Sequence, residues 1–409
     1  MHFVFEVDGY NALDHHTPVA WKLLQKHYSV TFIVVDNSNF ADNVRIRFLA
    51  DFPKFSLYYL TKITSTRQRF LFRQLSRLLF GRVAFLFRTN TSRLWWLRNV
   101  SRMVGIGKLS DIPLADIAIS GWGDPSSFVM TSLANCGAEI VALPHGYPCI
   151  KNTDFNPHIK AVIQKTGKNP DFSLRNHFRA YVVATERNKR LLLDWKMDDD
   201  IVRVWGNARF SPEWIHKLHQ ILPIFQGLTD MNTSSLQRVV FFLPSSTSAF
   251  ESSAIQSLIS RLSDEDVTLV IKPHTREGQV LSKLLPKNYH QTKNVFVASQ
   301  YDSSALIQWS TTVLNFATGT AVEALVLGKR FVFCKYLTTN SLSWEDCQGI
   351  VIANAEEEVL TAIRNPNWST DLELVSHYLD QELLAGGRVP DPLHHYVEQL
   401  EFIARESKQ

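Results

Sequence analysis

The chain has 409 residues, of which 45% are hydrophobic and 20% are charged, and its formal net charge is +4 at pH 7. That length suits two ordinary domains, and the composition is typical of globular proteins, which excludes a disordered or fibrous chain. No apolar run approaches the ~20 residues that a membrane-spanning helix needs, so we expect no such helix.

The N-terminus and the cysteines bear on the cellular compartment. Met1 leads directly into the strand-like residues 2–7, without the basic stretch and the cleavage site of a signal peptide, so none is expected. The chain has four cysteines, which are Cys136, Cys149, Cys334 and Cys347. They form no CxxC pair and have no ligand spacing to histidine, so neither zinc nor disulfides are indicated and a reduced, cytoplasmic compartment is favoured.

Short β-branched runs alternate with longer helix-like stretches, which predicts an α/β fold with parallel sheets built from βαβ units. In the first half the expected strands are residues 3–7, 30–35, 117–120, 139–143, 180–184 and 201–205. In the second half they are residues 238–243, 268–271, 295–297, 312–315 and 330–334, and helices are expected at 249–262, 303–309 and 321–327.

Residues 56–108 form a basic and aromatic segment. It holds eleven Lys and Arg residues, no Asp or Glu, and many interleaved Phe, Leu and Trp residues. Such a segment can place apolar side chains in a lipid interface while its arginines meet anionic head groups, so we predict contact with an anionic membrane surface. Two alternatives remain, which are core helices with solvated arginines and a nucleic-acid surface, although no nucleic-acid-binding motif accompanies the segment.

Residues 211–236 have the composition of a linker. Pro212 opens a helix-like stretch that runs to residue 225, and a polar stretch rich in Gly, Ser, Thr and Asn follows it. We therefore predict an N-terminal domain over residues 1–210 and a C-terminal domain over residues 237–370. Residues 371–409 are expected to form two helices that cross back to brace the first domain.

Polar residues follow successive expected strands of the second half, where parallel sheets bind their ligands. Ser245 and Ser246 lie in a small, hydroxyl-rich turn that can approach a phosphate closely. Lys272 and His274 flank a proline after the next strand, and a cation with an imidazole can stabilise or protonate a leaving phosphate.

A third turn, Thr318-Gly319-Thr320, opens the helix expected at 321–327 and has a geometry that suits an anion. Glu323, one turn into that helix, could accept hydrogen bonds from a ribose diol or a base. Each residue alone has an ordinary alternative, either as a surface side chain or as a helix cap. Three such turns on the strand ends of one sheet together predict a nucleotide-binding site.

The segments LVIKPHTREG and VLNFATGTAVEALVLGKRFVF resemble the donor half of GT-B glycosyltransferases of bacterial surface-polysaccharide synthesis. They are similar to motifs of bacterial polysialyltransferases, Kdo transferases and CDP-glycerol glycerophosphotransferases, which use cytidine-activated donors. Those families often have His-Pro after the cation, whereas here the proline precedes the histidine. The resemblance implies the GT-B fold, which has two Rossmann-like domains with parallel sheets facing a central cleft. It also implies a set of donor-binding residues: Lys272, His274, Thr318, Gly319, Thr320 and Glu323.

The first half shows the same resemblance at two further places. EIVALPHGYP is similar to a strand-ending His-Gly of that group, which implies that His145 lies at the mouth of the N-terminal sheet and faces the donor. VRVWGNARFSPEW resembles the Gly-containing segment that closes the N-terminal domain, and it adds Asn207 and Arg209 to the donor-binding candidates. Arg209 and Arg276 are the candidates for holding a carboxylate of the donor.

Four further residues are candidates for positioning or deprotonating the acceptor. Asp14 and His15 follow the first expected strand, and their alternative is a helix cap with exposed histidines. Asp124 and Glu186 also follow expected strands, and any of these carboxylates could be an inverting base or a retaining nucleophile. No Asp-x-Asp motif stands near a donor strand, so we predict catalysis without a metal and without a bound cofactor.

Together these residues predict a cytoplasmic glycosyltransferase that is peripheral at the inner face of the bacterial cytoplasmic membrane. We expect it to move a sugar onto a lipid-linked surface glycan and to bind no nucleic acid. A CMP-activated ulosonic acid, such as Kdo or a sialic-acid-like sugar, is the favoured donor, and CDP-glycerol or a UDP-sugar is the nearest alternative. A sugar-nucleotide 2-epimerase and a membrane-peripheral scaffold with a degenerate site are the alternatives of other classes.

Overall fold

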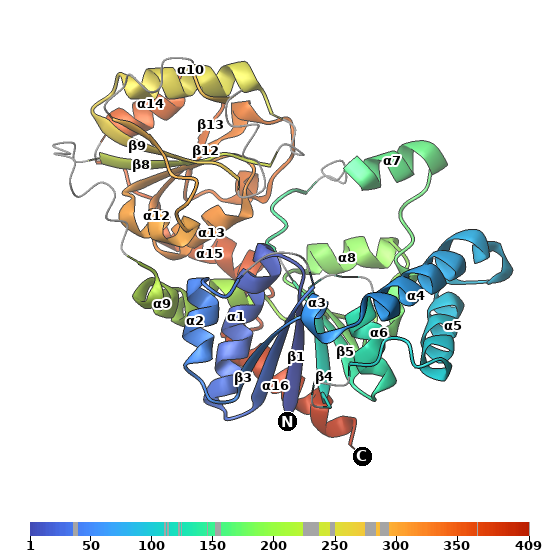
Figure 1. Cartoon of the computed structure of the whole chain (residues 1–409). Coiled ribbons are helices and arrows are strands. Elements are labelled where there is room, and N and C mark those ends of the chain that lie inside the picture. The colour runs from blue at the N-terminus through green and yellow to red at the C-terminus, as the bar shows by residue number, and fades with distance from the viewer. Residues whose placement is uncertain are drawn as a thin grey trace. The chain divides into compact units, whose positions relative to one another are not determined.

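The computed structural model describes residues 1–35, 40–109, 112, 114–121, 123, 125–144, 146–151, 157–223, 237–245, 250–274, 284–286, 294–365 and 367–408. The chain divides into two units, which are drawn in Figure 1. Unit 1 comprises Met1–Gly146, Asn169–Trp214 and Gln381–Gln409. Unit 2 comprises Tyr147–Lys168 and Ile215–Asp380.

The units differ from the sequence-based domains in two segments. Residues 147–168, which we assigned to the first domain, belong to unit 2, and residues 371–380 belong to it as well. The first difference has a local cause, because Ile150 forms an antiparallel bridge with Leu342 and the amide of Lys151 donates to the carbonyl of Ser341 at 2.8 Å. Such pairing between distant segments leaves no signal in composition.

Unit 1 is built on a seven-stranded parallel sheet in the order β3-β2-β1-β4-β5-β6-β7. Its strands are β1 (His2–Val7), β2 (Ser29–Val34), β3 (Phe55–Tyr59), β4 (Ile117–Gly121), β5 (Glu139–Leu143), β6 (Ala180–Val183) and β7 (Val202–Val204). All six expected strands are present. The edge strand β3 was not predicted, because its side chains are only half-buried and it runs into the basic segment.

Unit 2 is built on a six-stranded parallel sheet in the order β10-β9-β8-β11-β12-β13. Its strands are β8 (Gln237–Phe242), β9 (Val267–Lys272), β10 (Val295–Val297), β11 (Thr312–Asn315), β12 (Arg330–Cys334) and β13 (Val351–Ala353). The five expected strands are present, and the three-residue edge strand β13 was not predicted. In both sheets the first strand of the unit lies in the middle, so the order reverses between β1 and β4 and between β8 and β11. Open parallel sheets bind their ligands at such switch points.

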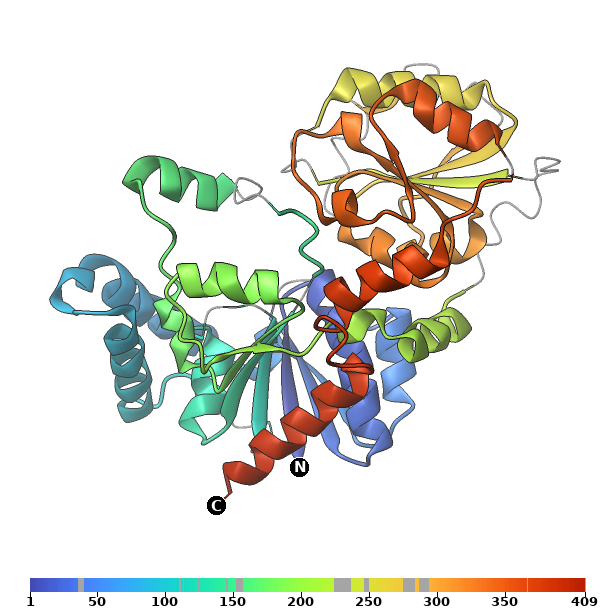
Figure 2. The ribbon, with the colours of Figure 1, turned by 180° about the vertical axis from the view of Figure 1, so that it is seen from behind.

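Helices cover both faces of each sheet, as Figure 1 and the reverse view in Figure 2 show. The helices that begin in unit 1 are α1 (Tyr10–Gln25), α2 (Val44–Ala50), α3 (Leu60–Ile63), α4 (Thr66–Arg77), α5 (Asn90–Met103), α6 (Phe128–Asn135), α8 (Glu186–Asp194), α9 (Pro212–Ile221) and α16 (Pro392–Glu406). Those that begin in unit 2 are α7 (Pro157–Thr166), α10 (Ser252–Ser263), α12 (Ser303–Trp309), α13 (Val322–Val326), α14 (Glu356–Arg364) and α15 (Leu372–Leu383). Because both faces are covered, strands such as β1 are buried along their whole length.

The C-terminal helix α16 belongs to unit 1 and packs against α1. Two ion pairs fix its position, since Lys26 contacts Glu401 at 2.6 Å and Lys408 contacts Asp116 at 2.8 Å. Figure 2 shows α16 lying across one face of the sheet. The last helix therefore stabilises the unit that the N-terminus begins.

One part of unit 1 projects beyond its sheet. We name residues 66–104 the basic hairpin, in which α4 and α5 pack against each other. Its buried side chains form a small apolar cluster of Phe72, Leu79, Leu94 and Leu97. In the described part of the chain, no helix is both long and apolar enough to cross a membrane.

Candidate functional site

The strand register of unit 2 brings the predicted donor-binding turns to one edge of the sheet. Lys272, the last residue of β9, lies opposite Phe242 in β8. Because Leu314 of β11 lies opposite Phe241, its neighbour Asn315 falls in the same cross-strand row as Lys272. These two residues are two strands apart, which at the usual strand spacing is about 10 Å. The ends of β8, β9 and β11 therefore share the switch point of this sheet.

Lys272 is the buried cation of this edge. Its side chain is 4% exposed, and its ammonium group donates to the carbonyl of Ser299 at 2.9 Å. Burial lowers the pKa of Lys272, while the negative charge of Asp302 acts in the opposite direction. Within the described residues Lys272 forms no ion pair, so its positive charge is buried without a contacting carboxylate. Such a charge is costly unless a partner compensates it, which makes this position suited to an anionic ligand.

The Thr318-Gly319-Thr320 turn is shaped by a residue that we did not predict. The amide of Asn315 donates to the carbonyl of Thr318 at 3.1 Å and accepts from its N–H at 3.2 Å, which holds the turn next to the strand end. Gly319 permits a close approach, since a Cβ there would lie 2.6 Å from the carbonyl oxygen of Tyr147. The glycine is thus required by contact with the protein's own main chain.

Tyr147 anchors the segment that packs on this turn. Its hydroxyl lies 3.0 Å from the Ser343 hydroxyl and 3.1 Å from the Tyr378 hydroxyl, so three buried hydroxyl groups meet. The ring of Tyr147 also packs on Trp344. The sequence analysis selected His145, which lies outside the described residues, and did not select Tyr147, two positions later in the same motif.

Glu323 is placed differently from our expectation. Its carboxylate is fully buried, and it accepts a hydrogen bond from the Ser304 hydroxyl at 2.7 Å and lies 2.9 Å from Nε2 of His219. These contacts join α9, α12 and α13 inside unit 2. The geometry favours a structural role for Glu323 over contact with a ribose, because both carboxylate oxygens already have partners within the fold.

Several other candidates from the sequence fall into two groups. Some lie near the carboxyl edge of the unit 2 sheet, and others lie outside the described residues. Ser245 is half-buried three residues beyond the end of β8, and His274 is half-buried two residues beyond Lys272. Four candidates lie outside the described residues, namely Asp124, His145, Ser246 and Arg276. Among the residues that are described, no group of three or more His, Cys, Asp or Glu side chains could hold a metal ion.

In unit 1, Asp14 is held between two buried arginines. Its Oδ1 lies 2.7 Å from a terminal nitrogen of Arg45, and its Oδ2 accepts from Nε of Arg209 at 2.7 Å. The two arginine side chains are each 1% exposed. A carboxylate whose two oxygens both contact guanidinium groups is a poor proton acceptor for a substrate, so this geometry favours a structural role for Asp14 over the role of a base.

The neighbouring candidates of unit 1 are also engaged within the fold. The ring of His15 packs edge-on against Phe210 with centroids 6.0 Å apart. Asn207 is buried, and its side chain accepts from the amide of Arg209 at 3.2 Å. Glu186 is exposed at the start of α8 and forms an ion pair with Arg388. None of these contacts places a carboxylate at the switch point of the unit 1 sheet.

A buried carboxylate does lie at that switch point, and sequence reasoning missed it. Glu6 of β1 accepts a hydrogen bond from the hydroxyl of Ser120 in β4 at 3.1 Å, and both side chains are buried. The sequence showed it as a single acidic residue that follows the apolar run Phe3–Phe5 in the strand HFVFEV. An ionisable residue at such a position is a candidate for function, because a purely structural strand gains nothing from a buried charge.

Known proteins resemble this chain in structure and not in sequence. No family model matches the chain, and no curated protein matches it. The UDP-GlcNAc 2-epimerase of Methanocaldococcus jannaschii has a TM-score of 0.58 at 11% identity, with 98% of this chain and 100% of that chain covered. The UDP-GlcNAc 2-epimerase of Neisseria meningitidis, bound to UDP-GlcNAc, has a TM-score of 0.57 at 13% identity, covering 98% and 99%. A glycosyltransferase from Rickettsia africae has a TM-score of 0.54 at 12% identity, covering 100% and 98%.

At these identities the similarity concerns the fold alone. It covers almost the whole chain and therefore both parallel sheets. The chain has the GT-B fold, with two Rossmann-like units.

Proposed function

We propose that this protein is a glycosyltransferase whose nucleotide-activated donor binds at the carboxyl edge of the unit 2 sheet. The observation that supports this most is Lys272, a buried cation beside the ends of β8 and β11 that contacts no carboxylate among the described residues. A donor phosphate would supply the missing negative charge. The hydroxyl groups of Ser245 and of the turn at residues 318–320 would add hydrogen bonds to it.

Lys329 provides an internal comparison for this interpretation. It belongs to the same unit, and burial likewise lowers its pKa. Its ammonium group, however, donates to the carbonyls of Gln308 and Ser310 at 3.0 and 2.8 Å. These carbonyls lie at the C-terminal end of α12, where a lysine compensates the helix dipole. Lys329 is thus explained by the fold alone, whereas Lys272 is not.

A CMP-linked ulosonic acid remains the favoured donor, because the segments at Lys272 and at residues 318–320 resemble motifs of families that use cytidine-activated donors. The carboxylate of such a donor needs a further cation, for which Arg209 and Arg276 are the candidates from the sequence. Arg209 already pairs with Asp14, and Arg276 lies outside the described residues. A UDP-GlcNAc 2-epimerase is the alternative with structural neighbours of that name, and a UDP-sugar transferase remains the alternative from the sequence, with a glycosyltransferase of unstated donor among the neighbours.

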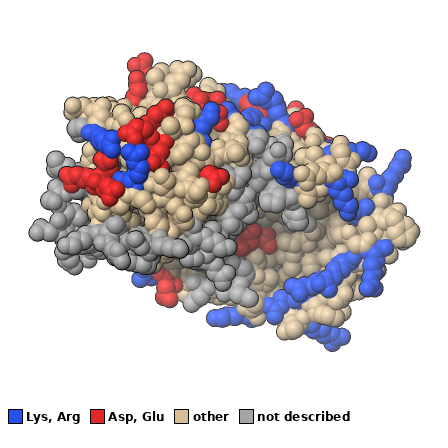
Figure 3. Space-filling view, turned by 90° about the horizontal axis from the view of Figure 1, so that it is seen from above, with Lys and Arg blue, Asp and Glu red and all other residues tan. Residues whose placement is uncertain are grey.

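The basic hairpin favours a transferase with a membrane-bound acceptor over an epimerase. Nine of the fourteen large hydrophobic side chains that are exposed among the described residues lie in it, and Phe85 is 81% exposed. Figure 3 shows Lys and Arg side chains gathered at the lower right, over the region of α4 and α5, with no Asp or Glu among them. Exposed aromatic side chains beside arginines suit the interface of an anionic membrane. A soluble epimerization reaction needs no such surface.

The donor site is tested by thermal-shift titration of the whole chain with CMP, CDP, UMP and UDP. A nucleotide at ~100 times its dissociation constant adds about 2.7 kcal/mol to the stability of the folded state, which is a clear rise in melting temperature. We expect the largest rise with CMP. Lys272→Met should abolish it, while the matched variant Lys329→Met should melt earlier without nucleotide but retain the rise.

The outcomes separate the candidates. A preference for UMP and UDP, together with conversion of UDP-GlcNAc in the absence of any acceptor, would establish the epimerase instead. An equal loss of the nucleotide response in both lysine variants would remove Lys272 from the site. No response of the unmodified chain to any of the four nucleotides would contradict the proposed function itself.

Membrane contact predicts a second result, in sedimentation with lipid vesicles. The double variant Phe85→Ser with Leu86→Ser should reduce binding to vesicles that contain phosphatidylglycerol by about tenfold or more, because each buried side chain of this size contributes ~1.5–3 kcal/mol. The control is Phe402→Ser, which removes an exposed phenylalanine of α16 in the same unit. Equal binding by the double variant and the control would show that the hairpin does not enter the lipid.

A further inference from the structure

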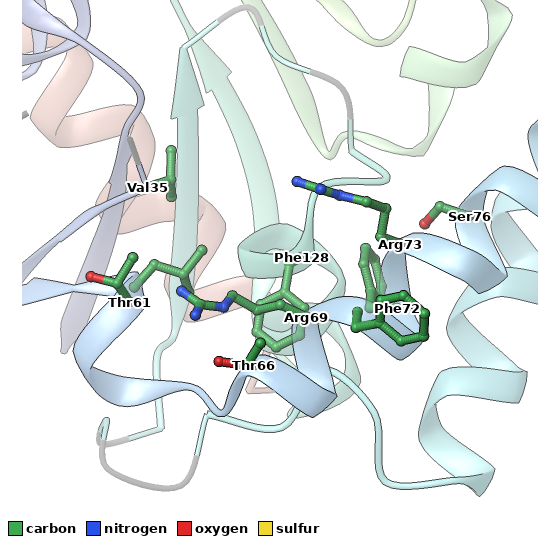
Figure 4. A pocket seen from close by; sticks show the side chains of 10 residues that line it. Val35, Thr61, Thr66, Arg69, Phe72, Arg73, Ser76 and Phe128 are labelled. Carbon is green, nitrogen blue, oxygen red and sulfur yellow. The ribbon is translucent and has the colours of Figure 1, made fainter. Parts of the chain in front are cut away.

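Unit 1 contains a cavity of about 790 Å³ beside α4. It lies at the carboxyl ends of two strands, because Val35 directly follows β2 and Leu60 directly follows β3. Figure 4 shows the cavity from close by, with Arg69 and Arg73 reaching from α4 and Thr61 on the opposite side. The position is one where parallel sheets bind ligands, and its lining includes none of the catalytic or donor-binding candidates of the sequence analysis, although much of it belongs to the basic segment 56–108.

The polar groups of the cavity suit an anion. Arg69 and Arg73 are four residues apart on α4, so their side chains lie on one face of the helix. In the described part of the chain, neither guanidinium group forms an ion pair or a hydrogen bond. The hydroxyl of Ser76 also lines the cavity and is buried, and it has no hydrogen-bond partner among the described residues. Residues 56–108 contain no Asp or Glu, so the segment that carries these arginines supplies no carboxylate to them.

Apart from the hydroxyl groups of Thr61 and Thr66, the remaining lining is apolar, and it is continuous with the basic hairpin. Phe72 and Phe128 pack edge-to-face at 5.2 Å and form part of the wall. Phe72 also belongs to the buried cluster of the hairpin, and Phe70 on the same helix is exposed. A ligand that fits this lining combines an anionic group for the arginines with an apolar part that leads toward the exposed side chains of the hairpin.

We propose that this cavity binds the phosphate or diphosphate group of a lipid-linked acceptor. Two guanidinium groups can each donate a pair of hydrogen bonds to phosphate oxygens, and the Ser76 hydroxyl can add another. The lipid chain of the same molecule extends into the membrane that the hairpin contacts. This inference rests on the proposed function, since it names the class of acceptor that the transferase uses.

The test uses farnesyl diphosphate as a soluble probe and the full-length chain. Titration calorimetry should show binding to the unmodified chain, and the double variant Arg69→Gln with Arg73→Gln should weaken it by at least about tenfold. The matched control is Arg82→Gln with Arg88→Gln, which removes two exposed arginines of the same hairpin that do not line the cavity. The control should bind the probe as the unmodified chain does.

Each other outcome overturns the proposal. If the unmodified chain does not bind the probe, or if both double variants weaken binding equally, the cavity is not the site. If inorganic diphosphate binds as tightly as farnesyl diphosphate, the site recognises a free anion. If the cavity variant loses only its binding to phosphatidylglycerol vesicles, the arginines meet bilayer head groups. The nucleotide-induced rise in melting temperature is measured on the same samples, so failure of the donor site is detected separately.

Discussion

Replacing Asp14 by alanine is expected to lower the free energy of unfolding of unit 1 by about 3–5 kcal/mol. The carboxylate lies 2.7 Å from Arg45 and 2.7 Å from Arg209, and both arginine side chains are almost completely buried. Removing it leaves two buried guanidinium charges without their common partner. That cost far exceeds the contribution of an exposed ion pair.

The change is best measured by hydrogen exchange of peptides from α1 and α2, because a chain with two units need not unfold in a single transition. Asp171→Ala serves as the control, since its partner Lys196 is exposed and the pair should contribute at most about 1 kcal/mol. Asp14→Asn keeps the shape and removes the charge. If Asp14→Asn leaves exchange unchanged but abolishes sugar transfer, Asp14 acts on the substrate and the structural assignment is wrong.

The fold could be predicted from the sequence because buried parallel strands are apolar along their length. Runs such as residues 3–7 and 268–271 fall within β1 and β9, which are buried throughout. The prediction failed at the sheet edges, where β3 is half-buried and β13 has only three residues. It also failed where the chain changes unit, because residues 147–151 pair with a segment almost 200 residues away.

The candidate site could be predicted only in part, since motifs locate turns but do not reveal what each side chain contacts. The strand-end positions of Lys272 and the turn at residues 318–320 follow from the apolar runs before them. The partners of Glu323 and Asp14 could not be predicted in this way. Glu323 contacts His219, which is 104 residues away in the sequence, and Asp14 contacts Arg209, which is 195 residues away. The identity of a buried charged residue does not by itself show whether that residue contacts a ligand or another residue of the protein.

Gly206→Ala is expected to destabilise unit 1 by about 2–5 kcal/mol, through two separate causes. Gly206 has a φ of +78°, a conformation that costs a residue with a Cβ about 1–2 kcal/mol. A Cβ there would also lie 2.3 Å from the carbonyl oxygen of Leu383, so the main chain must move. The adjacent amide of Asn207 donates to that same carbonyl at 2.8 Å, and the Tyr396 hydroxyl donates to the carbonyl of Gly206 at 2.9 Å. Displacement here therefore loosens the C-terminal helix from the segment that carries Arg209.

The two causes can be separated with a second glycine of the same unit. Gly387 has a φ of +77°, but a Cβ there would meet nothing within 4 Å. Gly387→Ala should thus cost only the backbone contribution of about 1–2 kcal/mol, and the excess cost of Gly206→Ala measures the close contact. Hydrogen exchange of α16 should rise in Gly206→Ala and remain unchanged in Gly387→Ala. Equal effects of the two variants would mean that the main chain of residues 383–396 moves away from the added Cβ without loss of stability. In that case α16 does not hold the Arg209 segment in place.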